Sequence, residues 1–315
     1  MKRLAKSALL FIAIGLALYA AVYFAAEQLM YRTGRSNPFF KIATTQQSAY
    51  DWVVLGASHA MPMDFDDFNA YMQHETGLRI LNLASPGTGP LYNRFVLEHF
   101  LRAHRTKNVL YVVDSFAFYS RTWNEERFAD AKLLRRTPLE SAIATRLWGY
   151  ARDEGVDPRA LLDYVAGFSK INNRERFERD LWEGEKQFDR VYPPSTSAVK
   201  KRIAYLYPDK TAATALSRYL EAFSMLIATA KRAGANVVVI KMPTPSQYRS
   251  QLPDEAAFDQ AMSRLLAAAD ARLRDFSPAI DEPRFYFDSD HLNRAGMTEF
   301  FARDLKPVLM QGRAD

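Results

Sequence analysis

After about residue 50, short apolar runs alternate with longer stretches of helical periodicity. Short apolar runs bounded by turn residues are typical of buried strands, and their alternation with helices indicates a parallel sheet covered on both faces. Strands are predicted at 52–55, 79–83, 108–113, 236–241 and 284–287, and helices at 64–75, 91–103, 211–233, 254–276 and 294–309. This pattern predicts an α/β, flavodoxin-like doubly wound sheet with strand order 2-1-3-4-5.

The alternation stops between about residues 116 and 207. Helical patterns occur there at 139–150, 159–168 and 174–186, but no convincing strand does. We interpret this stretch as a helical insertion after strand three. An insertion of this length either walls the site, as a lid does, or forms a packing subdomain without a chemical role, and the sequence leaves both open.

The N-terminus combines a basic start at residues 1–6 with an uncharged apolar segment at 7–26. About 20 apolar residues suffice for a helix to cross a bilayer. The excess of Lys and Arg before the segment places the N-terminus in the cytoplasm and the rest of the chain outside. We therefore predict a single-pass protein of the inner (cytoplasmic) membrane, periplasmic in a Gram-negative cell, with a tether at 27–50 and a folded domain at 51–315.

A cleaved signal peptide is the alternative interpretation of this segment. Signal peptides have a shorter apolar region that ends in two small residues spaced by one. Here residues 22–26 read Val-Tyr-Phe-Ala-Ala, with bulky aromatic residues where a small one is required. The sequence therefore favours an uncleaved anchor.

Composition narrows the possible functions. A hydrophobic content of 48% and a charged content of 25% describe a globular protein. The net charge of +6 is spread over interleaved acidic and basic residues, so we predict no nucleic-acid partner. The absence of cysteine excludes disulfides, thiolate metal sites and a cysteine nucleophile. His74, His99 and His104 lack the spacing of metal ligands, and we predict neither a metal nor a cofactor.

Candidate chemistry begins at Ser58, which follows the first apolar run in a glycine-containing turn. Sites in open α/β sheets are built at the carboxyl ends of strands. A serine nucleophile needs a base, and His291 is the candidate, with Asp288 three residues earlier to orient it. Asp290 could orient the imidazole instead. His59 is expected only to fill the start of the next segment.

The tetrahedral intermediate of such a reaction also needs hydrogen-bond donors for its oxyanion. The backbone N–H of Ser58 is one candidate. Gly87 is another, because a glycine lets its backbone approach the substrate closely. Asn93, at the start of the helix after the glycine loop, is a further candidate for substrate binding, although capping or packing would also explain it.

Three segments resemble motif blocks of the SGNH (GDSL-like) hydrolase superfamily. Residues 56–59 read Gly-Ala-Ser-His, with Ala where the family has Asp; residues 82–87 read Asn-Leu-Ala-Ser-Pro-Gly; residues 288–293 read Asp-Ser-Asp-His-Leu-Asn. The resemblance covers residues 51–114 and 237–309 and leaves the insertion uncovered. It implies esterase or acyl-transfer chemistry through an acyl-serine, with Ser58, His291 and Asp288 in the catalytic roles.

One block departs from the family pattern. The family takes an oxyanion-hole asparagine from the end of strand three, where residues 113–116 here read Val-Asp-Ser-Phe. An ionised Asp114 would repel an oxyanion, so Ser115 or a backbone amide substitutes, or the hole has two donors.

The missing asparagine and the N-terminal anchor together make the sequence similar to one branch of the superfamily. The members of that branch are membrane-anchored and act in teichoic-acid D-alanylation and alginate O-acetylation. The resemblance implies acyl transfer to an envelope polysaccharide or polymer, beside a membrane-bound O-acyltransferase as partner. A catalytically degenerate scaffold that binds the polymer or docks on that partner is the alternative.

Overall fold

A computed structural model of the chain describes residues 1–34, 37–178 and 180–312. The chain divides into two compact units, one formed by Met1–Ala43 with Phe128–Asp180 and the other by Thr44–Arg127 with Leu181–Asp315. Only part of the predicted insertion therefore groups with the N-terminal helices. The second unit contains the sheet and every candidate site residue.

The described residues of the first unit form helices joined by turns and loops, without a strand, and the longest element is α1, Lys2–Thr33. This helix is long and apolar enough to cross a membrane. The predicted tether at 27–50 is largely folded, because it holds the end of α1, the helix α2 and the start of the first strand. The other helices of this unit are α2 (Pro38–Thr44), α5 (Ala131–Leu134), α6 (Ser141–Asp153), α7 (Pro158–Ala166) and α8 (Phe168–Ile171).

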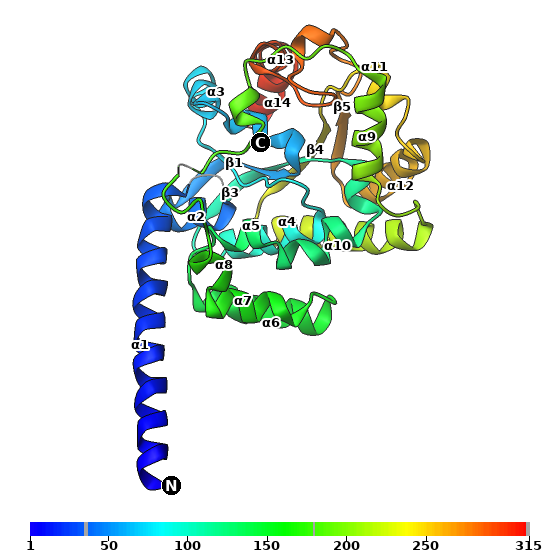
Figure 1. Ribbon diagram of the computed structural model, residues 1–315. Helices are drawn as coiled ribbons and strands as arrows, with labels where there is room; N and C mark the ends of the chain where they lie inside the picture. Colours follow the sequence, from blue (N-terminus) through cyan, green and yellow to red (C-terminus); the bar gives the residue numbers. More distant parts are fainter. Residues whose placement is uncertain (35–36, 179, 313–315) are drawn as a thin grey trace. The chain divides into compact units, whose positions relative to one another are not determined.

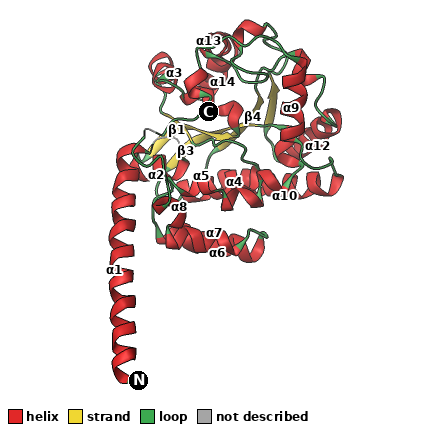
Figure 2. Cartoon of the chain, viewed as in Figure 1, coloured by secondary structure: helices red, strands yellow, loops and turns green. Residues whose placement is uncertain are grey.

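The second unit is built on a parallel sheet, drawn in yellow in Figure 2. Its five strands have the order β2-β1-β3-β4-β5, which confirms the predicted topology. The central strands pair in register through apolar residues, such as Val53 with Val109 and Val109 with Val237. Near-continuous apolar runs are expected where a sheet is covered on both faces. The strands are β1 (Ala49–Gly56), β2 (Ile80–Asn82), β3 (Arg105–Val112), β4 (Asn236–Lys241) and β5 (Arg272–Asp275).

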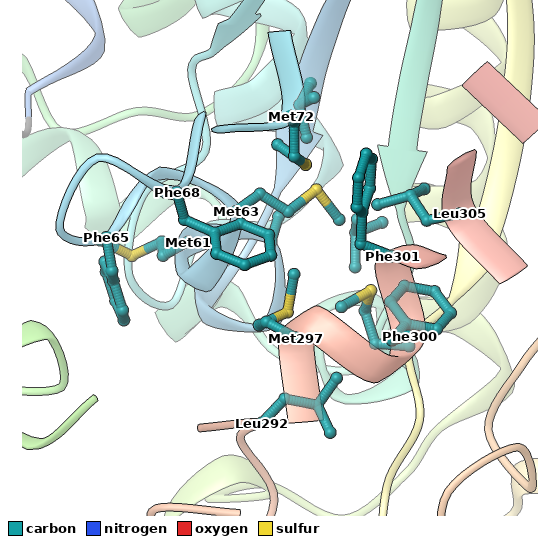
Figure 3. Close-up of a cluster of buried hydrophobic side chains, with 14 of the residues drawn as sticks. Met61, Met63, Phe65, Phe68, Met72, Leu292, Met297, Phe300, Phe301 and Leu305 are labelled. Carbon is teal, nitrogen blue, oxygen red and sulfur yellow. The ribbon is translucent and has the colours of Figure 1, made fainter. Parts of the chain in front are cut away.

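Helices cover both faces of this sheet (Figure 1). On one face α4 (Pro90–Phe100) packs against α10 (Ala213–Arg232), with the rings of Tyr111 and Phe223 4.5 Å apart. On the other face, methionine and phenylalanine side chains from the segment after β1 meet those of the C-terminal helices (Figure 3). Trp52 links this face to the C-terminus, because its Nε1 donates to the Leu309 carbonyl at 3.1 Å.

The remaining elements of the second unit connect these layers. Its other α-helices are α3 (Phe68–Thr76), α9 (Thr196–Leu206), α11 (Ser246–Arg249), α12 (Glu255–Ala268), α13 (Arg294–Phe300) and α14 (Lys306–Gln311). Its short 3₁₀ and π turns are η1 (Ser58–Asp64), η2 (Ser115–Phe118), η3 (Arg121–Trp123), η5 (Glu185–Gln187), η6 (Pro283–Phe285) and η7 (Phe301–Leu305), with η4 (Glu125–Ala129) at the boundary of the units.

The predicted position of strand five is wrong. Strand β5 is Arg272–Asp275, which the periodicity assigned to the end of a helix over 254–276. It is a short, charged edge strand, a form that protects sheet edges and carries no apolar signal. The predicted run at 284–287 forms η6 instead, and Tyr286 and Phe287 are buried without joining the sheet.

The insertion differs from the prediction in two places. The described part of 174–186 has no α-helix and ends in the 3₁₀ turn η5. Helix α9 was not predicted, yet Ser195 caps it by accepting from the N–H of Ala198. A serine before a helical run is an N-cap signal.

Candidate active site

The turn after β1 requires a glycine. Gly56 has a φ of +140°, and a Cβ there would lie 2.6 Å from the Val112 carbonyl oxygen. Its N–H donates to Asn93 Oδ1 at 3.1 Å, and its carbonyl accepts from Thr88 Oγ1 at 3.1 Å and from the N–H of Ser85 at 3.4 Å. These bonds tie the strand end to the glycine loop after β2 and fix where Ser58 begins η1.

Ser58 and Gly87 both keep an unused backbone donor. Within the described residues, no group accepts a hydrogen bond from either N–H. The Ser58 hydroxyl also makes no hydrogen bond there, although the residue is only 4% exposed. Gly87 has a φ of +60°, which favours glycine. The two N–H groups are therefore available for an oxyanion, and that role stays a prediction.

His291 lies in a loop that holds it against Asp288. Its Nδ1 is 2.8 Å and 3.0 Å from the two carboxylate oxygens of Asp288, but 3.8 Å from the nearest oxygen of Asp290. The backbone N–H groups of Asp290 and His291 also donate to Asp288, at 3.0 Å and 2.8 Å. Of the two acids that the sequence left open, Asp288 is the one beside Nδ1. A proton on Nδ1 leaves the lone pair on Nε2.

His59 belongs to the same cluster, which the sequence analysis missed. Its ring centroid lies 4.7 Å from that of His291, and its Nδ1 lies 2.5 Å from Asp114 Oδ1. Its Nε2 lies 3.3 Å from Asp290 Oδ2, within ion-pair distance but without hydrogen-bond geometry. Burial lowers the pKa of His59, but Asp114 and Asp290 outweigh burial and raise that pKa to about 10. His59 is therefore an imidazolium at neutral pH.

Arg202 on α9 was also missed. Its Nε lies 2.9 Å from Asp290 Oδ2, and its Nη2 lies 3.5 Å from His291 Nε2. Burial raises the pKa of Asp290, but its interactions with Arg202 above all, and with His291 and His59, outweigh burial and hold that pKa well below its usual range. The Arg202 guanidinium thus lies next to His291 Nε2, the nitrogen that would accept a proton from Ser58. No sequence spacing connects α9 to this loop.

Three side chains of this cluster could hold a metal ion by their spacing. The ligand atoms of His59, Asp290 and His291 lie within 4.8 Å of one another. Arg202 contacts Asp290 and His291 on their ligand atoms, so a metal cation would have to displace a guanidinium. The residues therefore fit a metal poorly, and its absence stays a prediction.

Ser115 and Asn93 have partners within the protein. The Ser115 hydroxyl bonds to the carboxylate of Glu255 and lies 2.7 Å from the Tyr207 hydroxyl. The Asn93 amide donates to the carbonyls of Gly89 and Thr88, at 2.9 Å and 3.2 Å, while its oxygen accepts from Gly56. Either residue would have to give up these bonds to bind an oxyanion or substrate, so both binding roles stay predictions. The bonds of Asn93 also support the turn after β1.

A pocket of about 100 Å³ opens beside His59. Its polar wall includes Asp114, Ser115 and the buried Lys241, whose Nζ lies 2.5 Å from Glu255 Oε1 and also pairs with Asp259. Because the ammonium is paired with carboxylates, the wall offers hydrogen-bonding groups more than a net charge. Ser58 itself is not part of the lining.

Comparison with known proteins adds little to this geometry. No protein-family model matches the chain, and no curated protein matches it significantly. Among solved structures, TesA is similar with 11% identity over 83% of this chain and 94% of that chain, at a TM-score of 0.38. A Bacteroides fragilis protein assigned as an acylhydrolase is similar with 9% identity over 86% and 95%, at a TM-score of 0.41. TM-scores this low carry no argument about function.

Replacing Gly87 by alanine is expected to destabilise the second unit by about 1–3 kcal/mol. A Cβ would lie 2.7 Å from the Trp123 ring, in a backbone conformation that side chains disfavour. Gly77→Ala is the matched control, because its φ of +67° is similar but its surroundings are open. Denaturant unfolding measures both variants. Equal losses would show that the overlap with Trp123 is relieved at no cost.

Proposed function

We propose that the chain is a membrane-anchored, extracytoplasmic serine acyltransferase or esterase that acts on acyl esters of an envelope polysaccharide or polymer. The observation that carries this proposal is the His291–Asp288 pair, at 2.8 Å, beside the turn that contains Ser58. The ring of His291 lies 4.7 Å from that of His59, the residue that follows Ser58, in a tilted arrangement. A serine, a histidine with its Nδ1 held by a carboxylate, and unused N–H groups are the parts that acyl transfer needs.

In this mechanism the Ser58 hydroxyl attacks the acyl carbonyl carbon and gives its proton to His291 Nε2. The tetrahedral intermediate collapses, the leaving group takes the proton from His291, and an acyl-serine remains. An acceptor hydroxyl then gives its proton to His291 and attacks the acyl-serine, and the proton returns to Ser58. Asp288 stabilises the imidazolium in both halves. Water as the acceptor makes the same cycle a hydrolysis.

The reacting geometry differs from the described one at His291 Nε2, which makes no hydrogen bond to the Ser58 hydroxyl within the described residues and instead faces Arg202. Arg202 must leave His291 Nε2, 3.5 Å away, before that nitrogen can accept the Ser58 proton. Catalytic hydrogen bonds are often longer without substrate than in the reacting complex. Asp290 would retain Arg202 through the Nε contact during this shift.

The oxyanion would accept hydrogen bonds from the backbone N–H groups of Ser58 and Gly87. An ionised Asp114 on its own would repel the oxyanion. The imidazolium of His59 neutralises the Asp114 carboxylate and so removes this repulsion. Fixed charges and dipoles in a water-poor site stabilise a transition state strongly. This arrangement would replace the asparagine of the related superfamily.

The pocket indicates the class of acyl acceptor, and the anchor indicates where the acyl donor would be met. A wall of paired charges and hydroxyls suits a neutral, polyhydroxylated acceptor such as a sugar unit. The apolar helix α1 would keep the site near the bilayer, where a membrane-bound O-acyltransferase could deliver acyl groups. The proposal needs no cofactor.

A catalytically degenerate scaffold is the second candidate function. It is favoured by the Ser58 hydroxyl, which makes no hydrogen bond to His291 within the described residues, and by the guanidinium of Arg202 at His291 Nε2. Such a protein would bind the polymer or dock on the membrane acyltransferase without forming an acyl-serine.

Labelling with a fluorophosphonate distinguishes the two functions. The enzyme is expected to form an adduct at Ser58, located by peptide mass spectrometry, which Ser58→Ala lacks and His291→Ala forms much more slowly. Ser197→Ala, at the exposed start of α9, is the control and should label normally. A small acyl ester can enter a site that a lid closes to larger probes. Folded protein that neither labels nor hydrolyses such an ester would support the scaffold.

A further inference from the structure

Helices α7 and α8 contact α1 inside its apolar segment. The Tyr19 hydroxyl donates to the Ala166 carbonyl at 2.8 Å. The backbone at Gly167, with a φ of +66°, packs so closely on Tyr23 that a Cβ would lie 1.7 Å from its ring. Further along, Glu27 forms a buried ion pair with Lys170. These contacts fix the height of α7 and α8 along α1.

That height corresponds to the edge of a bilayer if α1 crosses it with residues 7–26. At a rise of 1.5 Å per residue, Tyr23 lies about 5 Å and Tyr19 about 10 Å inside the end of this segment. Interfacial helices bury their apolar faces about 5–10 Å into the boundary between headgroups and acyl chains. Helices α6 and α7 run across the axis of α1, which continues past them toward the N-terminus (Figure 1).

The same helices expose large apolar side chains. Leu162, Val165 and Phe168 are 67%, 55% and 61% exposed, at a spacing of three residues. Tyr164 faces inward, where its hydroxyl donates to the Pro138 carbonyl at 2.6 Å. We call Leu162, Val165 and Phe168 the apolar patch. A helix with one packed face and one exposed apolar face has an unpartnered surface.

We propose that the apolar patch inserts into the interfacial region of the leaflet through which α1 leaves the membrane. The inference rests on the anchor in the proposed function. It selects lipid over a protein partner because Tyr19 and Tyr23, inside the apolar segment, set the level of α7 and α8. The first unit then has two membrane contacts, a spanning helix and a surface patch, which together prevent rotation about α1.

Site-directed spin labelling tests this inference on the full chain, which has no native cysteine. Single variants Leu162→Cys, Val165→Cys and Phe168→Cys are labelled and reconstituted into phosphatidylcholine–phosphatidylglycerol vesicles. Leu16→Cys reports on the anchor, and Val191→Cys, 59% exposed in the second unit, is the control. All five side chains are exposed, so the substitutions should leave the fold intact. The ratio of oxygen to nickel-complex accessibility measures contact with lipid.

We expect the patch positions and position 16 to show ratios several-fold above that of position 191. If position 16 lies in lipid while the patch positions match position 191, the patch inference fails and the anchor stands. If position 16 lies in water, both the anchor and the patch inference fail. Patch labels that are shielded from oxygen and nickel alike would indicate a protein partner and overturn the lipid assignment.

Discussion

Replacing Ser58 or His291 by alanine is expected to lower the turnover of a small acyl ester by about 10³- to 10⁶-fold, the range seen when members of a catalytic triad are removed. Ser58→Ala removes the oxygen that would carry the acyl group in the proposed mechanism, and His291→Ala removes the base. Hydrolysis of p-nitrophenyl acetate by the full chain in detergent measures the effect. Circular dichroism checks that each variant folds.

Matched controls separate catalysis from stability in this experiment. His74→Ala removes an imidazole that is 85% exposed, and it should retain the wild-type rate. The double variant Ser58→Ala with His291→Ala should lose little more than either single variant, because residues that act as a unit are not additive. A wild-type rate in Ser58→Ala would remove the acyl-serine from the mechanism.

The sequence predicted the sheet because the central strands are apolar on both faces. The runs at β1, β3 and β4 could not be solvated helices, and their order followed from the alternation with helices. The edge strand β5 could not be predicted in this way, because its sequence, Arg-Leu-Arg-Asp, has three charged residues and a single apolar one. Edge strands are specified by their neighbours more than by their own hydrophobicity.

The candidate site was predictable where its residues are close in sequence. Asp288 and His291 are three residues apart, and a loop can fold that spacing back on itself. The partnership of His59 with Asp114 spans 55 residues, and that of Arg202 with Asp290 spans 88. Contacts of that range depend on the register of β1 against β3 and on the path of α9. The sequence predicted that the end of β3 belongs to the site. It did not predict that His59 would neutralise Asp114 there.

The imidazolium of His59 should make the stability of the second unit fall as the pH rises. Its pKa is about 10 in the folded chain against an ordinary value of 6.5. A raised pKa contributes stability that is complete below pH 6.5 and is lost as the pH approaches 10. The upper bound on this contribution is about 5 kcal/mol, from 1.4 kcal/mol for each pH unit of the shift.

The difference between the wild type and His59→Gln isolates this effect. Denaturant unfolding at pH 6.5 and at pH 10 should show a stability loss of several kcal/mol in the wild type and a much smaller one in the variant. Tyr248, whose ring lies 6.4 Å from that of His59, does not confuse the result, because burial raises its pKa well above the usual value. At pH 6.5 the variant should be the less stable protein, since Asp114 and Asp290 lose a buried countercharge. Equal losses in both proteins would mean that His59 is neutral in the fold, and Asp114 would then oppose an oxyanion unscreened.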